Sequence, residues 1–76
     1  MTEDEIRTRI GLAIKSRREW IGESQAFIAK KFGMSEDGYR HWENGSRMPT
    51  IFTLYRLAKV LRCPLAELLP SDIKVD

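Results

Sequence analysis

The sequence has little cysteine and no long apolar run. Because Cys63 is the single cysteine, an internal disulfide and a zinc site built from several cysteines are both excluded, and a reducing compartment is indicated. No apolar segment approaches the ~20 residues that a membrane-spanning helix needs, and the acidic start at residues 2–5 does not resemble a signal peptide. With 76 residues, the chain has the length of one small domain. We therefore expect a single cytoplasmic domain.

Groups that could carry out catalysis are also scarce. The only histidine, His41, has no second histidine and no cysteine pair with which to hold a metal, and no serine or cysteine stands in a recognisable nucleophile motif. We therefore expect no enzyme activity, no metal and no cofactor. Cys63 is expected to pack as a small apolar residue, and Trp20 and Trp42 are expected in the core or at its edge.

The formal net charge is only +2, but the charges are unevenly distributed. Residues 7–62 contain twelve of the thirteen basic side chains and five acidic ones, which gives this middle part a net charge of +7, whereas both ends are acidic. A basic body suits a polyanion such as nucleic acid. Small helical domains also carry many solvated lysines and arginines, so charge alone leaves both interpretations open.

Apolar residues recur at helical spacing, and no alternating pattern predicts a strand. The first helix is expected from about Glu3 to Trp20, because Thr2 and Glu5 fit a capping box. Gly22 separates this helix from the next one. The predicted inner face of the first helix consists of Ile6, Ile10, Ala13, Ile14 and Ile21.

Two short helices joined by a tight turn are predicted between Ser24 and Gly45. Ser24 and Ser35 are suitable N-caps, and Gly33 stands where a helix ends in a left-handed residue. The predicted inward-facing residues of the two helices are Ile28, Ala29, Phe32, Tyr39 and Trp42. A helix, a turn of a few residues with a glycine, and a second helix form the helix-turn-helix pattern.

Two more helices are predicted after the loop at residues 46–49. Thr50 is a suitable cap for a fourth helix over about 51–61, Pro64 begins a last short helix, and Pro70 ends it. Their predicted inner residues are Ile51, Leu54, Leu57, Ala58, Leu61, Leu65, Leu68 and Leu69. We therefore predict an all-α domain of five helices in residues 1–70, followed by a tail at residues 71–76.

The segment from Ser24 to Gly45 resembles the helix-turn-helix of the lambda-type phage repressors, the Cro/CI or XRE family. The residues that carry this likeness are Gln25, Ala29, Gly33, Ser35, Trp42, Glu43, Asn44, Gly45 and Pro49, with Gly11, Ile14 and Arg18 upstream and Leu54, Leu57, Ala58, Leu61, Leu65 and Leu68 downstream. The likeness covers about residues 6–69 and implies the five-helix, lambda repressor-like DNA-binding fold. The sequence departs from it at Glu23, where relatives carry an apolar residue, and at Arg62, where relatives often carry glycine.

The resemblance also assigns roles to particular residues. It implies a partly buried, structural salt bridge between Arg18 and Glu43. The residues expected to read bases are Glu36, Asp37, Arg40 and His41. The residues expected to contact DNA phosphates are Gln25, Asn44, Ser46, Arg47 and Thr50.

Two acidic residues in the implied reading helix are unexpected beside DNA. Glu36 and Asp37 could accept hydrogen bonds from a cytosine amino group. They could instead be favourable partners of the helix dipole, held away from the groove, or they could repel phosphate. Gly38 could allow a close approach of the helix to the groove. The sequence leaves these alternatives open.

The function implied by the resemblance is sequence-specific binding to double-stranded DNA, as a repressor of a phage or mobile element. One recognition helix reads few base pairs, so a homodimer on a near-palindromic operator is expected. Its contact surface is expected in the C-terminal region, with Leu65, Ile73 and Val75. Two alternatives remain: an antitoxin-type module that binds a toxin protein as well as its own promoter, and a controller protein of a restriction-modification system.

Overall fold

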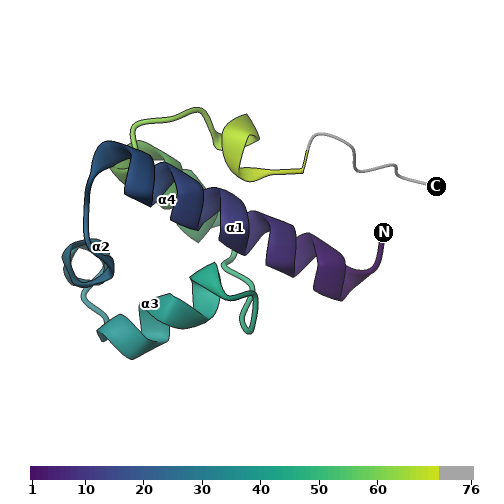
Figure 1. Cartoon of the computed structure of the whole chain (residues 1–76), viewed down its shortest axis with the longest axis horizontal. Coiled ribbons are helices and arrows are strands. Elements are labelled where there is room, and N and C mark those ends of the chain that lie inside the picture. Colours follow the sequence, from purple (N-terminus) through teal and green to yellow (C-terminus); the bar gives the residue numbers. More distant parts are fainter. Residues whose placement is uncertain (71–76) are drawn as a thin grey trace.

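Helices account for all the regular structure in residues 1–70, the part of the chain that this computed structural model describes (Figure 1). The elements are α1 (Glu3–Ile21), α2 (Gln25–Lys31), α3 (Glu36–Glu43), α4 (Ile51–Val60) and a 3-10 turn, η1 (Leu65–Leu68). The predicted all-α fold is confirmed. The fifth helix is only a 3-10 turn, because Pro64 and Pro70 leave too few residues between them for an α-helix.

Each of the four α-helices begins at a hydroxyl side chain that the sequence predicts as its cap. Thr2, Ser24, Ser35 and Thr50 each accept a hydrogen bond from the backbone N–H three residues later. These bonds satisfy amides that have no partner inside the helix. One detail differs from the predicted capping box, since the Glu5 carboxylate accepts from the Thr2 hydroxyl and not from the Thr2 amide.

A left-handed residue follows each of the four α-helices, and after α3 it is Gly45, with φ +80°. Gly22 ends α1 with φ +78°, and Gly33 lies in the turn between α2 and α3 with φ +64°, as predicted. Arg62 follows α4 with φ +59°, although it has a side chain. That conformation is costly for any residue except glycine, which is why glycine is the usual residue in this place.

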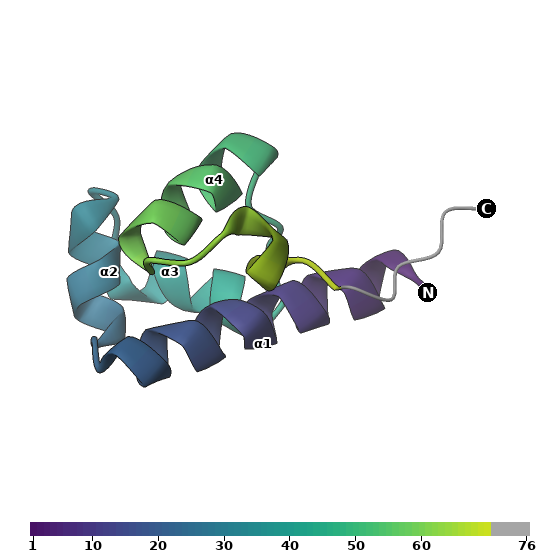
Figure 2. The same ribbon diagram turned by 90° about the horizontal axis from the view of Figure 1, so that it is seen from above.

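The long helix α1 is the element against which the others are arranged (Figures 1 and 2). In Figure 1, α3 lies below α1 and α4 lies behind it, while α2 is seen end-on beside the C-terminal end of α1. Figure 2 shows α2 crossing the end of the molecule and the turn η1 lying between α4 and α1. The pair α2 and α3 therefore forms one side of the domain, supported by α1.

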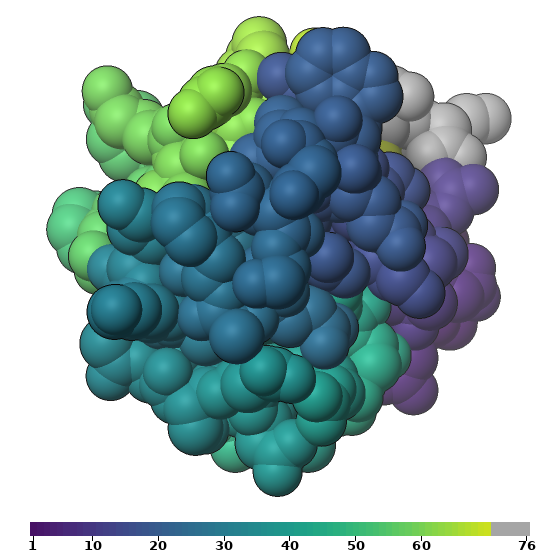
Figure 3. Space-filling model, turned by 60° about the vertical axis from the view of Figure 1, so that its left-hand side comes forward, coloured from purple at the N-terminus to yellow at the C-terminus, as the bar shows by residue number. Residues whose placement is uncertain are grey.

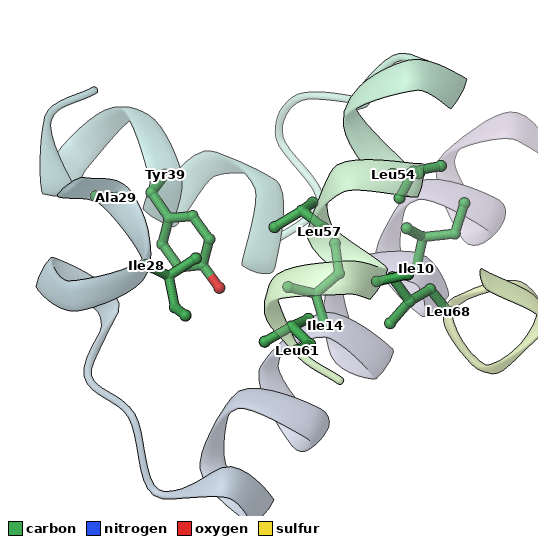
Figure 4. Close-up of a cluster of buried hydrophobic side chains, with 10 residues drawn as sticks. Ile10, Ile14, Ile28, Ala29, Tyr39, Leu54, Leu57, Leu61 and Leu68 are labelled. Atoms are coloured by element: carbon green, nitrogen blue, oxygen red, sulfur yellow. The ribbon is translucent and has the colours of Figure 1, made fainter. Parts of the chain in front are cut away.

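The core draws at least one side chain from each element (Figure 4). Its buried members are Ile10, Ile14, Ile28, Ala29, Tyr39, Leu54, Leu57, Ala58, Leu61 and Leu68. All of these were predicted to face inward. Cys63 and Trp42 pack against this cluster and are partly buried, which agrees with their predicted places.

Two predicted core residues are exposed instead. Ile51 is 65% exposed, because it is the first residue of α4 and this end of the helix projects beyond the other helices (Figure 2). Trp20 is 74% exposed, because it stands six residues after Ile14 and so falls on the opposite face of α1 from the buried stripe. The Trp20 ring instead lies under the Arg17 guanidinium, at 4.3 Å from ring centroid to Cζ.

Within residues 1–70, none of the helices has the length and apolar character that crossing a bilayer requires. The predicted tail at residues 71–76 lies outside the described residues, and the boundary between domain and tail stays a prediction.

Candidate nucleic-acid interface

The position of α3 on α1 depends on the absence of a side chain at Gly11. A Cβ atom at Gly11 would stand 2.4 Å from the carbonyl oxygen of Glu43 and 2.6 Å from that of Trp42. No real Cβ contact is that short, so α1 and α3 meet backbone against backbone at this point. The C-terminal half of α3 is therefore held on α1 at a separation that only glycine allows.

A buried ion pair fixes the same end of α3. Arg18 in α1 donates from Nε to Glu43 Oε2 at 2.6 Å and from Nη2 to Glu43 Oε1 at 3.1 Å. The two residues are 9% and 5% exposed. Tyr39 donates its hydroxyl to Glu43 Oε2 at 2.5 Å, and Arg18 Nη1 donates to the carbonyl oxygen of Glu23 at 2.9 Å. A buried charge pair with its remaining atoms satisfied orients the elements that carry it.

The protonation of this group of side chains follows from its geometry. Burial alone would raise the pKa of the Glu43 carboxyl, but hydrogen bonds from Arg18, Tyr39 and Gln25 outweigh it, and the pKa lies below its usual value. The hydrogen bond to Glu43 raises the pKa of the Arg18 guanidinium. Burial and the adjacent carboxylate raise the pKa of Tyr39. At neutral pH the carboxylate is ionised and the phenol is protonated.

Gln25 connects this buried group to the surface of α3. Its Nε2 donates to Glu43 Oε1 at 2.9 Å, and its Oε1 accepts from Arg40 Nε at 3.4 Å. The sequence assigned Gln25 to a phosphate contact at the start of α2 and gave no sign of this bridging position. Gln25 therefore joins the structural pair Arg18 and Glu43 to Arg40, one of the predicted base-reading residues.

Three of the predicted base-reading residues are paired with one another. Arg40 donates from Nη1 to Asp37 Oδ1 at 2.6 Å and from Nη2 to Glu36 Oε2 at 2.8 Å. All three side chains are exposed, and so is the fourth predicted reader, His41. The α2 and α3 segments lie side by side on the face shown in Figure 3. The exposed surface of α3 thus carries two carboxylates, a guanidinium and an imidazole.

The predicted phosphate contacts gather around the turn that follows α3. Asn44 Oδ1 accepts from the Ser46 amide at 2.9 Å and from the Ser46 hydroxyl at 2.5 Å, which orders this turn. Arg47 is exposed. Thr50 caps α4 with its hydroxyl. Gly45 also lies here, where its carbonyl oxygen accepts from Arg7 Nε at 3.2 Å.

An open hollow of about 350 Å³ lies between α1 and α3, close to Gln25. Its lining residues are Thr8, Leu12, Lys15, Gln25, Arg40, Glu43 and Asn44. Two of these side chains are cationic, and Gln25 and Asn44 are among the predicted phosphate contacts. The hollow therefore lies beside the predicted DNA-contacting residues, and its lining combines these two cations with the Glu43 carboxylate.

Of the three predicted dimer residues, only Leu65 belongs to the part of the chain that the structure describes. Leu65 is half-buried against the core of its own domain. Ile73 and Val75 lie outside the described residues. Four of the eight large apolar side chains that are exposed among the described residues lie in α4 or in the loop before it. We call these four the α4 face: Met48, Ile51, Phe52 and Tyr55. The sequence held a signal for it, because Phe52 and Tyr55 are large aromatics that fall off the inward stripe of α4.

Basic side chains border the α4 face and contact its aromatic rings. The Arg56 guanidinium lies 5.9 Å from the Phe52 ring centroid and 4.8 Å from that of Phe32. The Lys59 ammonium lies 5.2 Å from the Tyr55 ring centroid. The α4 face is therefore apolar at its centre and cationic at one edge.

Arg17, which the sequence did not single out, links α1 to the end of α4. Arg17 donates from Nε to the carbonyl oxygen of Leu61 at 2.9 Å and from Nη2 to that of Arg62 at 2.6 Å. These carbonyls have no partner within α4, so the arginine caps the helix from outside. Among the described residues, no group of three potential metal-ligating side chains is found.

The fold and the exposed face of α3 define a class, the small helix-turn-helix domain of the kind that binds DNA. A family model described as helix-turn-helix matches residues 14–68, well over half of the chain. The chain belongs to this family, and within it to the XRE type, as its resemblance to the phage repressors predicted. The family is one of DNA-binding regulators and not of enzymes.

One similar protein is the HTH-type transcriptional regulator DicA of Escherichia coli strain K12. The two sequences are 35% identical over 63 residues, which is 83% of this chain and 47% of DicA. The chain thus spans about half the length of that relative. The comparison therefore shows the family to which the chain belongs, and the activity of the whole protein is treated as a proposal.

Solved structures show the same fold. The DNA-binding domain of BldD superposes with a TM-score of 0.80 at 26% identity, over 92% of this chain and all of that domain. The hydroxypropylphosphonic acid epoxidase from S. wedmorenis also superposes with a TM-score of 0.80, at 29% identity over 91% of this chain. That likeness covers only 38% of the epoxidase, so it concerns one part of a larger chain.

Proposed function

We propose that this chain is a sequence-specific, double-stranded DNA-binding transcriptional regulator of the phage repressor type, with α3 as its recognition helix. The observation that carries the proposal is the contrast between the two sides of α3. Its inner side is fixed on α1 through Gly11 and the buried pair of Arg18 and Glu43. Its outer side presents exposed polar groups that can form hydrogen bonds with base edges. A rigid support and an exposed polar face suit insertion into the major groove.

In this proposal Arg40 and His41 read bases, and Glu36 and Asp37 stand beside them at the start of α3. An arginine can bind guanine through O6 and N7, and a histidine can donate to an acceptor on a base edge. Phosphates would be held by Gln25, Asn44, Ser46, Arg47 and Thr50. The net charge of +7 over residues 7–62 supplies the general attraction to DNA.

A homodimer on a near-palindromic operator is part of the same proposal. Two copies of α3 must enter successive major grooves about 34 Å apart, so the dimer contact must lie beside the DNA-facing side. The α4 face suits this contact better than Leu65 does, because its large apolar side chains are uncovered and Leu65 is half-buried. We therefore propose Met48, Ile51, Phe52 and Tyr55 as the dimer contact.

The proposal is tested by measuring binding to duplex DNA from the region upstream of the gene and to a scrambled duplex, over a series of salt concentrations. Tighter binding to the upstream duplex, with affinity that falls steeply as salt rises, is expected. Arg40→Ala and His41→Ala should each weaken binding to the upstream duplex at least tenfold, since one good base contact contributes about 1–3 kcal/mol. Neither should lower the melting temperature appreciably, because both side chains are exposed.

Lys30→Ala is a matched control, because it removes one exposed basic side chain from α2 and leaves both α3 and the α4 face unchanged. It should reduce binding to both duplexes by the same small factor. Equal, weak binding of the parent protein to both duplexes would contradict a sequence-specific regulator. That outcome would favour the alternative of a protein-interaction module, for which Glu36 and Asp37 are the first residues to examine.

A further inference from the structure

The guanidinium of Arg40 is held by two carboxylates of its own helix. Asp37 accepts from Nη1 at 2.6 Å, Glu36 accepts from Nη2 at 2.8 Å, and the amide oxygen of Gln25 lies 3.4 Å from Nε. Every nitrogen of the guanidinium thus has an acceptor within the protein. The face that should attract DNA most strongly therefore presents an arginine already neutralised, and the three charged side chains together carry a net charge of −1.

We propose that Glu36 and Asp37 form a carboxylate clamp that withholds Arg40 from the phosphate backbone and yields it only to a guanine–cytosine base pair in the major groove. The clamp would make binding more selective by weakening the attachment of α3 to DNA of any sequence. This inference rests on the proposed function, because it concerns the selectivity of the same recognition helix.

The physical argument begins with binding to arbitrary DNA. Such binding depends on cationic groups that neutralise phosphates and release counterions, so each available arginine strengthens it. If Arg40 moved to a phosphate, Glu36 and Asp37 would be left unpaired next to a polyanion. Their repulsion from the DNA would offset the attraction between Arg40 and the phosphate, so the clamped arginine adds little to binding without sequence preference.

At a guanine–cytosine pair, Arg40 and a carboxylate can exchange their contact with each other for hydrogen bonds to the bases. Guanine O6 and N7 accept two hydrogen bonds from an arginine, and the amino group of the paired cytosine donates to a carboxylate. Arg40 and one of the two carboxylates would then find partners of the correct sign within one base pair. The clamp itself is weak, because all three side chains are exposed and such surface pairs are readily broken.

Gln25 acts as a positioning residue for this exchange. Because its Nε2 is bonded to the buried carboxylate of Glu43, its Oε1 stays directed toward Arg40 Nε. When Nη1 and Nη2 leave the carboxylates, this third contact can keep the guanidinium beside α3 and limit its reach. The buried ion pair of Arg18 and Glu43 is thereby connected to the guanidinium of Arg40, which reads the base.

The chain contains a matched copy of the clamp away from α3. In α1, Arg7 is paired with Glu3 four residues before it and with Asp4 three residues before it, the same spacing as in the clamp. The double variants Glu36→Gln with Asp37→Asn, and Glu3→Gln with Asp4→Asn, therefore change the net charge equally. They differ in where the released arginine lies: Arg40 is on the recognition helix, whereas Arg7 is on α1 and its Nε stays bonded to the carbonyl oxygen of Gly45.

The experiment measures dissociation constants of the parent and both double variants for the upstream duplex and the scrambled duplex, over a salt series. The clamp variant should bind the scrambled duplex about tenfold more tightly, with the slope of log K against log salt steeper by about one unit for the phosphate that Arg40 then contacts. The ratio of the dissociation constant for the scrambled duplex to that for the upstream duplex should fall by about the same factor. The α1 variant should leave that ratio unchanged.

A third variant separates the clamp from simple removal of negative charge near DNA. Adding Arg40→Gln to the clamp variant should abolish the increase in affinity for the scrambled duplex and the steeper slope. If the increase persists without Arg40, or if the α1 variant lowers the ratio equally, the clamp is overturned. If the parent does not distinguish the two duplexes, the proposed function fails instead. Melting curves of each variant verify that α3 is still folded.

Discussion

Gly11 in α1 lies against the backbone of Glu43 in α3 so closely that a Cβ at Gly11 would stand 2.4 Å from the Glu43 carbonyl oxygen. The close approach and the buried ion pair act on the same residue, since the Glu43 side chain is bonded to Arg18. The backbone and the side chain of Glu43 are thus both fixed by α1. The helix α3 is therefore positioned from its C-terminal end.

Gly11→Ala should therefore destabilise the domain, although alanine normally favours a helix. The added methyl group can fit only if α1 and α3 separate, and overpacking of this kind costs about 1–3 kcal/mol. Gly38→Ala is the matched control within α3, because its Cβ would meet the flexible end of Met34 and the Ser35 hydroxyl at 3.2 Å. Its effect on the free energy of unfolding should stay within about 1 kcal/mol. Thermal melting of both variants distinguishes them, and equal losses would contradict the role of Gly11.

Arg18→Ala should unfold most of the protein at physiological temperature. It leaves the Glu43 carboxylate buried without its cation, and breaking one partner of a buried pair costs about 3–5 kcal/mol, a large part of the stability of a small domain. The double variant Arg18→Met with Glu43→Met removes both charges and should recover much of the loss. The measurement is chemical denaturation of the parent and both variants. If the double variant is no more stable than Arg18→Ala, the unpaired Glu43 carboxylate is not the cause of the lost stability.

The stability of the domain should fall on the acid side because of Glu43. Its pKa is lower in the folded chain than the unfolded value of 4.5, so the ion pair stabilises the fold fully above that pH and progressively less as pH falls through the folded pKa. The melting temperature measured from pH 7 to pH 2 should show this decline. The same double variant lacks the titrating group and should show a shallower decline. Identical acid profiles for the two proteins would assign the effect to other carboxyl groups.

Phe52→Glu should weaken self-association while leaving the fold intact. Phe52 is 66% exposed at the centre of the α4 face, so the substitution removes apolar contact area and adds a charge where a second copy would pack. Sedimentation over a range of concentrations, with and without the upstream duplex, measures the effect. Phe27→Glu is the control, because it alters an exposed phenylalanine on α2. A parent protein that stays monomeric at high concentration, both free and on DNA, would contradict the dimer.

Features that depend on residues close in sequence were predicted well. The hydroxyl caps at Thr2, Ser24, Ser35 and Thr50 act on amides three residues away, and the glycine turns depend on one backbone angle. The inward stripes follow directly from helical periodicity. The error at Ile51 arose where periodicity is insufficient, since a residue on the correct side of a helix is buried only if another element covers it.

The parts of the candidate site that could not be predicted depend on long side chains and on tertiary approach. Helical periodicity could not indicate that the guanidinium of Arg17 reaches two carbonyl oxygens after α4. The spacing of Glu36, Asp37 and Arg40 permits the clamp, but several rotamers of each side chain are compatible with it. Gln25 could be assigned to a bridge only once α2 and Glu43 were known to be adjacent.

The different surroundings of the two tryptophans have an optical consequence. Trp20 is 74% exposed, so its indole emission is already close to that of an unfolded chain. Trp42 is half-buried in α3, with the Phe32 and Tyr39 rings edge-on at 5.7 and 6.0 Å between centroids. A chain with Trp20→Phe would therefore have a single tryptophan, located in α3. When excited at a wavelength that tyrosine does not absorb, its emission would report on that helix without any attached dye.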